Sequence, residues 1–289
     1  TVICSDKTGT LTRNEMTVQR LWAGGESADV AGVGYAPDGE ISRDGQGLDI
    51  QQCPALLELL RAGLLCNDAV LKQVDIDWKI EGDPTEGALL VAAGKAGLAP
   101  RAVHDAYPRL DAIPFESQHQ YMATLHGGDD GIVYLKGSVE SLLERCATML
   151  GADGEAAPLD SQVIHQQVNA MASQGQRVLA FARLVVPAGT TGIDHPKVAS
   201  GLTFLGLQGM IDPPREEAIR AVRACQTAGV KVKMITGDHA ATAAFLQDMA
   251  SRAGFLRPYE FLEHALVHQG GRQALLARTG NKTTGPDFF

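Results

Sequence analysis

The chain has 289 residues, of which 45% are hydrophobic and 20% are charged, and its 25 basic and 34 acidic side chains give a formal net charge of -9. This length suits one large domain or two ordinary ones. The apolar fraction can fill a core, which excludes wholesale disorder. The acidic balance disfavours nucleic-acid binding, because proteins bind phosphate backbones with dense Lys and Arg.

The sequence also disfavours membrane insertion and export. Its longest apolar stretches, such as Gly201–Ile211 and Pro54–Cys66, are far shorter than the roughly 20 residues of a membrane-spanning helix. No basic and apolar leader is visible at the start, so we expect no export signal. The cysteines are odd in number and contain no CxxC pair, which predicts reduced thiols in a cytosolic compartment. They are Cys4, Cys53, Cys66, Cys146 and Cys225.

The first residues carry groups suited to phosphoryl chemistry. Thr1–Asp6, TVICSD, predicts a short buried parallel strand that leads into the segment KTGTLT. Ligands bind at the carboxyl ends of strands in open α/β sheets, and Asp6 stands at such an end. A carboxylate there can act as a nucleophile and form an acyl-phosphate. Because two anions repel, we expect Mg2+ to bridge them, with Asp6 and Thr8 as ligands and Lys7 adding positive potential.

A simpler interpretation of the same residues is that Asp6 and Thr8 only cap a turn. The string DKTGTLT is long and has little degeneracy, which favours the chemical role.

A second α/β pattern lies late in the chain. Leu202–Ile211 and Val230–Ile235 are strand-like, and Glu216–Ala228 between them has one apolar helical face that ends at Gly229. Strand, helix and strand at this spacing predict a βαβ unit. We therefore expect the end of its last strand to lie beside Asp6 in one parallel sheet.

Residues 15–208 form a long insert between these pieces. Met122–His126 and Ile132–Leu135 flank a loose turn and predict a hairpin. Arg177–Leu184 alternates like a further strand. The insert is expected to be an antiparallel sheet with helices on it. The predicted helices are Pro54–Cys66 and Pro84–Ala96.

The string CSDKTGTLT resembles the phosphorylation signature of the P-type cation-transporting ATPases, which belong to the haloacid-dehalogenase-like phosphotransferases. The resemblance implies an incomplete α/β phosphorylation (P) domain of that class, split into residues 1–14 and 209–245. It also implies an inserted α+β nucleotide-binding (N) domain, built on an antiparallel sheet, at residues 15–208. Residues 246–289 form a tail that does not align. By analogy, the motifs favour calcium-type or related bacterial pumps.

Glu86 lies in the string GDPTEGAL. Asp83 is suited to cap a helix that begins at Pro84, and Glu86 follows the cap by three residues, so a capping box explains it without a ligand. The string also resembles the N-domain motif whose Glu hydrogen-bonds the adenine amino group. We favour this nucleotide role for Glu86.

Phe115 precedes the predicted hairpin in the string IPFES. From the residues alone, an ordinary core Phe is the better interpretation. The string also resembles the family pattern P-F-x-S-x-x-x-x-M, and this resemblance makes a binding role the better interpretation. It implies that the ring stacks on adenine. The family often has Arg at the position of Ser117 and Lys at that of Gln120, so we assign no phosphate contact to either position.

Lys136 and Gly137 end a strand-like segment and precede the helix-like Ser138–Cys146. A solvated turn lysine is the alternative. The string YLKGSVE resembles the family's K-G-A-x-E, whose Lys lines the adenosine pocket, and glycine permits close approach of a nucleotide. Arg177 resembles the family Arg that reaches the nucleotide phosphates or ribose, although it could equally pair with a surface carboxylate.

The segment Thr236-Gly237-Asp238 follows the last predicted strand. Thr236 and the Gly237 N–H can hydrogen-bond the transferring phosphoryl oxygens, and Asp238 can also cap a following helix. The resemblance implies that these residues contact the nucleotide. Asp212 is expected to cap the helix that starts at Pro213. The resemblance also places Asp212 in the D-P-P-R hinge between domains, and we include it among the nucleotide contacts.

The family's P domain continues with a second Lys and a G-D-G-x-N-D loop that also binds magnesium, and this sequence contains neither. The actuator domain and membrane helices of the family are missing as well. We therefore expect a soluble piece of an integral membrane protein, from the cytoplasmic face of the membrane, whose partners are its own actuator and transmembrane domains. We expect it to bind ATP or ADP with little turnover.

Two other functions remain open. The first is a soluble haloacid-dehalogenase-like phosphatase, but such enzymes usually carry a second Asp two residues after the nucleophile, where this chain has Thr8. The second is a nucleotide-binding module without catalysis. The leading interpretation is the ATP-binding and phosphorylation region of a P-type ATPase, in which Asp6 attacks the γ-phosphoryl of MgATP in line.

Overall fold

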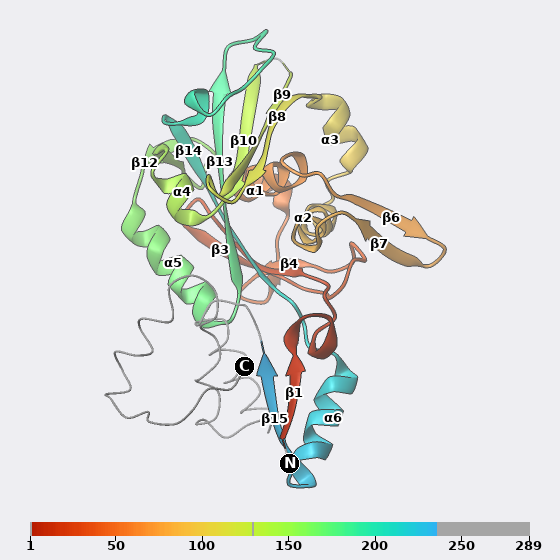
Figure 1. Cartoon of the computed structure of the whole chain (residues 1–289). Helices are drawn as coiled ribbons and strands as arrows, with labels where there is room; N and C mark the ends of the chain where they lie inside the picture. The colour runs from red at the N-terminus through yellow and green to blue at the C-terminus, as the bar shows by residue number, and fades with distance from the viewer. Residues whose placement is uncertain (1, 129, 236–289) are drawn as a thin grey trace, which may run out of the picture. The chain divides into compact units, whose positions relative to one another are not determined.

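The structure is a computed structural model that describes residues 2–128 and 130–235 (Figure 1). The chain divides into two compact units. The larger unit covers Thr12–Pro214. The smaller unit combines both ends of the chain, and the structure describes residues 2–11 and 215–235 of it.

The larger unit is built on an 11-stranded sheet. Its strands are β2 (Thr17–Ala23), β3 (Glu26–Val30), β4 (Ile41–Arg43), β5 (Gln46–Gly47), β8 (Arg109–Glu116), β9 (Tyr121–His126), β10 (Gly131–Gly137), β11 (Cys146–Leu150), β12 (Ala156–Pro158), β13 (Arg177–Val186) and β14 (Leu202–Ile211). They follow the order β5-β4-β3-β2-β14-β13-β10-β9-β8, and β11 joins β14 and carries β12. All pairs along this path are antiparallel, whereas β11 runs parallel to β14. The antiparallel sheet expected from the sequence is therefore confirmed.

Helices cover both faces of this sheet (Figure 1). Successive strand residues point to opposite faces, so Leu21 belongs to one apolar cluster and its neighbour Trp22 to the other. Because both faces are buried, β14 reads as an almost continuous apolar run, LTFLGLQGMI. The helices are α1 (Pro54–Leu65), α2 (Pro84–Lys95), α3 (Pro100–Ala106), α4 (Val139–Leu143) and α5 (Ser161–Ser173), with 3-10 turns η2 (Ile50–Gln52) and η3 (Pro196–Val198).

The two apolar clusters correspond to different sets of helices. The first joins α1 and α2 to the sheet through Leu59, Leu89 and Phe181. The second joins α4 and α5 to the other face through Leu142 and Ile164. A separate hairpin, β6 (Val70–Val74) and β7 (Asp77–Glu81), leads from α1 to α2. The predicted helices α1 and α2, the hairpin β9–β10 and the strand β13 are all confirmed.

The smaller unit contains two parallel strands and a helix. β1 (Val2–Asp6) pairs with β15 (Lys231–Ile235), and Asp6 lies opposite Ile235. α6 (Glu216–Thr227) ends in a left-handed Gly229, as the sequence predicts. A π-helical turn, η1 (Lys7–Leu11), follows β1.

The predicted βαβ unit is wrong in its first strand. β14 pairs with β13, β2 and β11 in the large sheet, whereas β15 pairs with β1 in the other unit. Local periodicity identified each element but not its neighbours, because β14 is apolar on both sides and suits either kind of sheet. β1 is also exposed rather than buried, since among the described strands it has only β15 as a neighbour.

Two predicted helix boundaries also need correction. α6 has Arg215 as its N-cap residue, not Asp212, because Asp212 is buried and bonded elsewhere. The helix expected over Ser138–Cys146 is the short α4, after which Cys146 begins β11. Among the helices of residues 2–128 and 130–235, none is both long and apolar enough to cross a lipid bilayer.

Candidate functional site

The start of α2 is fixed by a local cap. The Asp83 carboxylate accepts hydrogen bonds from the backbone N–H groups of Thr85, at 2.7 Å, and Glu86, at 3.3 Å, while Pro84 occupies the first turn. These are the donors that a helix leaves without partners at its first turn. The cap predicted from the sequence is confirmed.

The Glu86 side chain has partners outside the helix. Its Oε1 forms an ion pair with Lys136 Nζ, and its Oε2 accepts the backbone N–H of Asp68 at 3.1 Å. Asn67 Nδ2 donates to the Glu86 carbonyl oxygen at 2.9 Å, which ties the same loop to α2. Glu86 is therefore held by long-range contacts, and a capping box no longer accounts for its side chain.

Lys136 reaches Glu86 from the sheet. Lys136 stands on the same face of β10 as Tyr134, which belongs to the cluster that α1 and α2 cover. Its side chain is 9% exposed and that of Glu86 is 16% exposed. An ion pair with so little exposure to water interacts more strongly than a surface pair. Each charge also depends on its partner to offset the free energy lost when it leaves water.

Arg177 lies next to the same helix end. It is the first residue of β13, it is exposed, and its Nη1 lies 3.5 Å from Thr85 Oγ1. Phe181 follows Arg177 on β13 by an even number of residues, so the two side chains stand on the same face of the strand. Three residues singled out from the sequence, Glu86, Lys136 and Arg177, are therefore gathered at the N-terminus of α2.

Phe115 is a surface residue and not a core residue. The residue is 60% exposed, near the end of β8. The next residue, Glu116, lies opposite Tyr121 of β9, and Tyr121 lies opposite Gly137 of β10. Phe115 is thus at the same end of the sheet as Lys136 and Gly137, and its ring is open to a ligand.

Gly137 has a packing reason of its own. A Cβ atom there would lie 2.4 Å from the Gln120 carbonyl oxygen and 2.8 Å from Tyr121 Cβ. The neighbouring strand β9 therefore requires glycine at this position, whether or not a ligand approaches it.

Asp212 is buried near the point where the chain leaves the larger unit. Its Oδ2 accepts the Thr12 hydroxyl at 2.6 Å, and its Oδ1 is a buried oxygen without a hydrogen-bond partner. Burial, with added repulsion from Glu15, Asp212 and Asp83, raises the pKa of Tyr35 to about 12. Asp212 thus acts on Tyr35 through its charge, and its own hydrogen bond is to Thr12.

In the smaller unit, Asp6 is exposed at the carboxyl end of β1. Its place at the end of a parallel strand is the one that the sequence predicts. Lys7 and Thr8 belong to the π-helical turn η1. Thr236, Gly237 and Asp238 lie outside the residues that the structure describes.

Comparison with known proteins identifies the family. The model of the P-type ATPase cytoplasmic domain N matches residues 55–217, which contain α2, β10, β13 and the gathered side chains. The chain belongs to the P-type ATPase family.

Curated relatives agree with this assignment. Over 260 residues the chain is 54% identical to the cation-transporting ATPase pma1 of Synechocystis sp., which is 88% of this chain and 28% of that protein. It is 46% identical over 259 residues to the probable cation-transporting ATPase F of Mycobacterium tuberculosis, covering 89% and 28%. It is 38% identical over 247 residues to the calcium-transporting ATPase of Bacillus subtilis, covering 84% and 28%. The chain thus spans little more than a quarter of these relatives.

Two groups in this P-type ATPase chain were not singled out from its sequence. The loop residues Asn67 and Asp68 support Glu86, and Arg109 holds that loop through an ion pair of 2.6 Å with Asp68. Beneath the site, Cys66 is a free thiol whose pKa is raised by burial, so it stays neutral. No local pattern marks these residues, because their roles depend on how α1, α2 and β8 meet.

Proposed function

We propose that the larger unit binds the adenosine part of ATP or ADP through Glu86, Phe115, Lys136, Gly137 and Arg177. The observation that supports this most is the meeting of Glu86 and Lys136, which are 50 residues apart, at one end of the sheet. Both residues come from motifs that resemble the family's N-domain motifs.

Each side chain suits a different part of the nucleotide. The Glu86 carboxylate can accept a hydrogen bond from the exocyclic amino group of adenine, and its ion pair with Lys136 orients it. The exposed ring of Phe115 offers a face for base stacking. The exposed guanidinium of Arg177 can reach ribose or phosphate oxygens. Gly137 keeps the backbone of β10 close to β9 beneath this surface.

Calorimetric titration of the chain with ADP tests the adenosine site. Phe115→Ala should weaken binding about tenfold, because stacking of one base on an aromatic ring contributes about 1–3 kcal/mol. Leu110→Ala is the matched control, since Leu110 is another exposed apolar residue of β8, and it should bind as the parent does. Unchanged affinity in both Phe115→Ala and Lys136→Ala would contradict the site.

For the complete pump, we propose that residues 1–14 and 209–245 belong to a haloacid-dehalogenase-like P domain and that residues 15–208 form the N domain. Asp6 would accept the γ-phosphoryl group of ATP, with Lys7, Thr8, Thr236, Gly237 and Asp238 around it and Asp212 at the hinge. Support comes from the exposed carboxylate of Asp6 at a parallel strand end. That oxygen donor suits Mg2+, which Asp6 and Thr8 would hold and which supplies charge neutralisation when bound.

The pump as a whole is also part of this proposal. Phosphorylation of Asp6 would be coupled to cation movement through membrane helices, with this region on the cytoplasmic face and in contact with the actuator domain. The chain by itself is proposed to bind nucleotide with little turnover.

Acid-quench labelling tests the catalytic part separately. The chain is incubated with γ-labelled ATP and Mg2+, quenched with acid and counted, with Asp6→Asn as the control. We expect little label in either protein and equal ADP affinity in both. Stoichiometric label that disappears in Asp6→Asn would establish Asp6 as the acceptor and overturn the expected low activity.

A further inference from the structure

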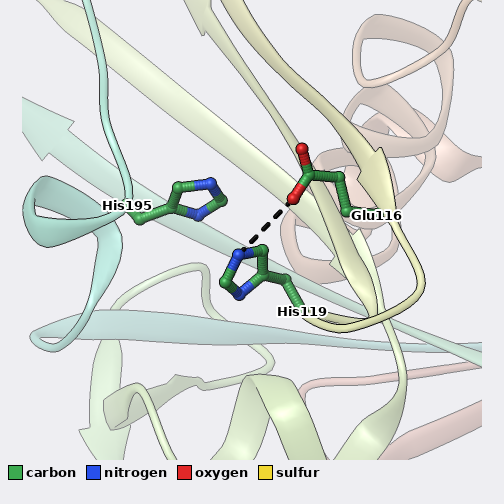
Figure 2. Close-up of side chains that lie close together, drawn as sticks. All are labelled: Glu116, His119 and His195. Atoms are coloured by element: carbon green, nitrogen blue, oxygen red, sulfur yellow. Dashed lines mark ion pairs between the residues drawn. The ribbon is translucent and has the colours of Figure 1, made fainter.

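Two histidines and a carboxylate meet at the turn between β8 and β9 (Figure 2). Glu116 ends β8, His119 lies in the turn, and His195 comes from the loop before η3. One ligand atom from each lies within 4.8 Å of the other two. The cluster shares no residue with the proposed nucleotide site, and the inference drawn from it does not depend on that function.

The side chains already interact with one another. Glu116 Oε2 lies 3.5 Å from His119 Nε2, and the rings of His119 and His195 have centroids 4.1 Å apart. Gln118 Nε2 donates to Glu116 Oε2 at 2.9 Å and lies 3.2 Å from His119 Nε2. Glu116 is exposed and the two imidazoles are partly exposed, so ions have access from solvent.

The backbone holds the two histidines in place from different sides. The His119 N–H donates to the Glu116 carbonyl oxygen at 3.0 Å, and the Ser141 hydroxyl donates to the His119 carbonyl oxygen at 2.9 Å. On the other side, Asp111 Oδ2 accepts the Ile193 N–H at 2.9 Å, and the next turn of chain is anchored by the fully buried Val198. The two segments are thus positioned without any ion.

A second set of contacts orients the His195 ring. Tyr121 Oη lies 2.6 Å from His195 Nδ1, and Arg145 stacks over the Tyr121 ring with its guanidinium carbon 4.8 Å from the centroid. Metal-binding histidines commonly have such a hydrogen-bonded partner, which fixes the ring and its tautomer. An isolated pair of surface histidines would not require this support.

We propose that Glu116, His119 and His195 form a binding site for a first-row transition-metal dication such as Zn2+. Two imidazoles and one carboxylate are a donor set that such ions favour, with water completing the coordination. Zn–N bonds of about 2.0 Å place tetrahedral donors about 3.3 Å apart. The donors must therefore close by at most about 1.5 Å, which rotations of these exposed and half-buried side chains would supply once Gln118 turns away.

The alternative is an ion pair and a ring stack that need no metal. That arrangement accounts for the Glu116–His119 contact but gives no reason for all three donors to converge. Metal titration distinguishes the metal site from this alternative, because only the metal site binds one ion per chain with ligands from both loops.

The test is titration of the full chain with Co2+, followed by displacement with Zn2+. We expect one equivalent of Co2+ to give the visible absorption of a protein-bound ion and one equivalent of Zn2+ to remove it. His119→Ala and His195→Ala should each abolish this signal. Tyr121→Phe should keep the ligands and weaken binding about tenfold or more.

His165→Ala is the matched control, because His165 is an exposed histidine outside the cluster, and it should bind as the parent does. Glu116→Gln gives a variant with the charge removed and the shape kept, and circular dichroism establishes that every variant is folded. Equal metal uptake by the parent, His119→Ala and His195→Ala, or no uptake by the parent, would overturn the proposal.

Discussion

Lys136 on β10 and Glu86 in the first turn of α2 form an ion pair that is largely shielded from water. Each residue has a further anchor: Lys136 lies within the sheet opposite Phe181, and Glu86 accepts the Asp68 N–H. The pair joins the sheet to the helix that carries the proposed adenosine site. Its strength should therefore affect stability and ligand binding together.

Replacing Lys136 should destabilise the larger unit. Lys136→Met removes the charge but keeps most of the apolar chain, which leaves the Glu86 carboxylate partly buried without its partner. We expect a loss of about 1–3 kcal/mol in the free energy of unfolding. Urea unfolding followed by tryptophan fluorescence measures it, because both tryptophans, Trp22 and Trp78, lie in this unit.

The control for that measurement is Lys72→Met. Lys72 pairs with Glu81 at 2.7 Å, but the two side chains are 51% and 64% exposed. Exposed pairs are worth about 0–1 kcal/mol. An equal effect of both substitutions would contradict a special role for the Lys136 pair.

Glu58 on α1 is a second buried carboxylate with several partners. It accepts Tyr134 Oη at 2.9 Å and Arg183 Nη1 at 2.8 Å, and it pairs with Arg61. Glu58→Gln removes the charge that both arginines face, so we expect about 2–4 kcal/mol of destabilisation in urea unfolding.

Glu26→Gln is the comparison for Glu58, since Glu26 pairs with Arg43 at the surface with 47% of its side chain exposed. Its effect should stay below about 1 kcal/mol. A Glu58→Gln protein as stable as Glu26→Gln would show that this network contributes little.

His126 should make stability depend on pH. It is fully buried, and burial lowers its pKa from 6.5 to about 4, while its ring nitrogens contact the Tyr107 carbonyl and Thr124 Oγ1. As the pH falls from about 6.5 to about 4, the unfolded chain binds a proton that the folded chain does not. Folding stability should therefore be complete above pH 6.5 and decline through this window, by up to about 3 kcal/mol.

Unfolding free energies measured across that window, for the parent and for His126→Asn, test this. The variant should lack the part of the slope due to His126, whatever its absolute stability. His165→Asn, at an exposed position, should keep the parent's slope. Parallel curves for the parent and His126→Asn would contradict a neutral buried imidazole.

Much of the local structure of this chain could be predicted. The spacing of apolar residues indicated α1, α2, α6, β13 and the β9–β10 hairpin, and Asp83 was recognisable as a helix cap. These features depend on residues close together in the chain, whose period and capping groups are visible directly. The motifs of the family were visible for the same reason.

What the sequence by itself determined is therefore these local elements and the family to which the chain belongs. The tertiary structure alone decided that β14 joins the large sheet, that Asp212 binds Thr12 rather than capping α6, and that His195 faces His119. It also decided that Glu86 pairs with Lys136. Each of these contacts joins segments distant in sequence, and strand order and register, which local periodicity does not encode, bring them together.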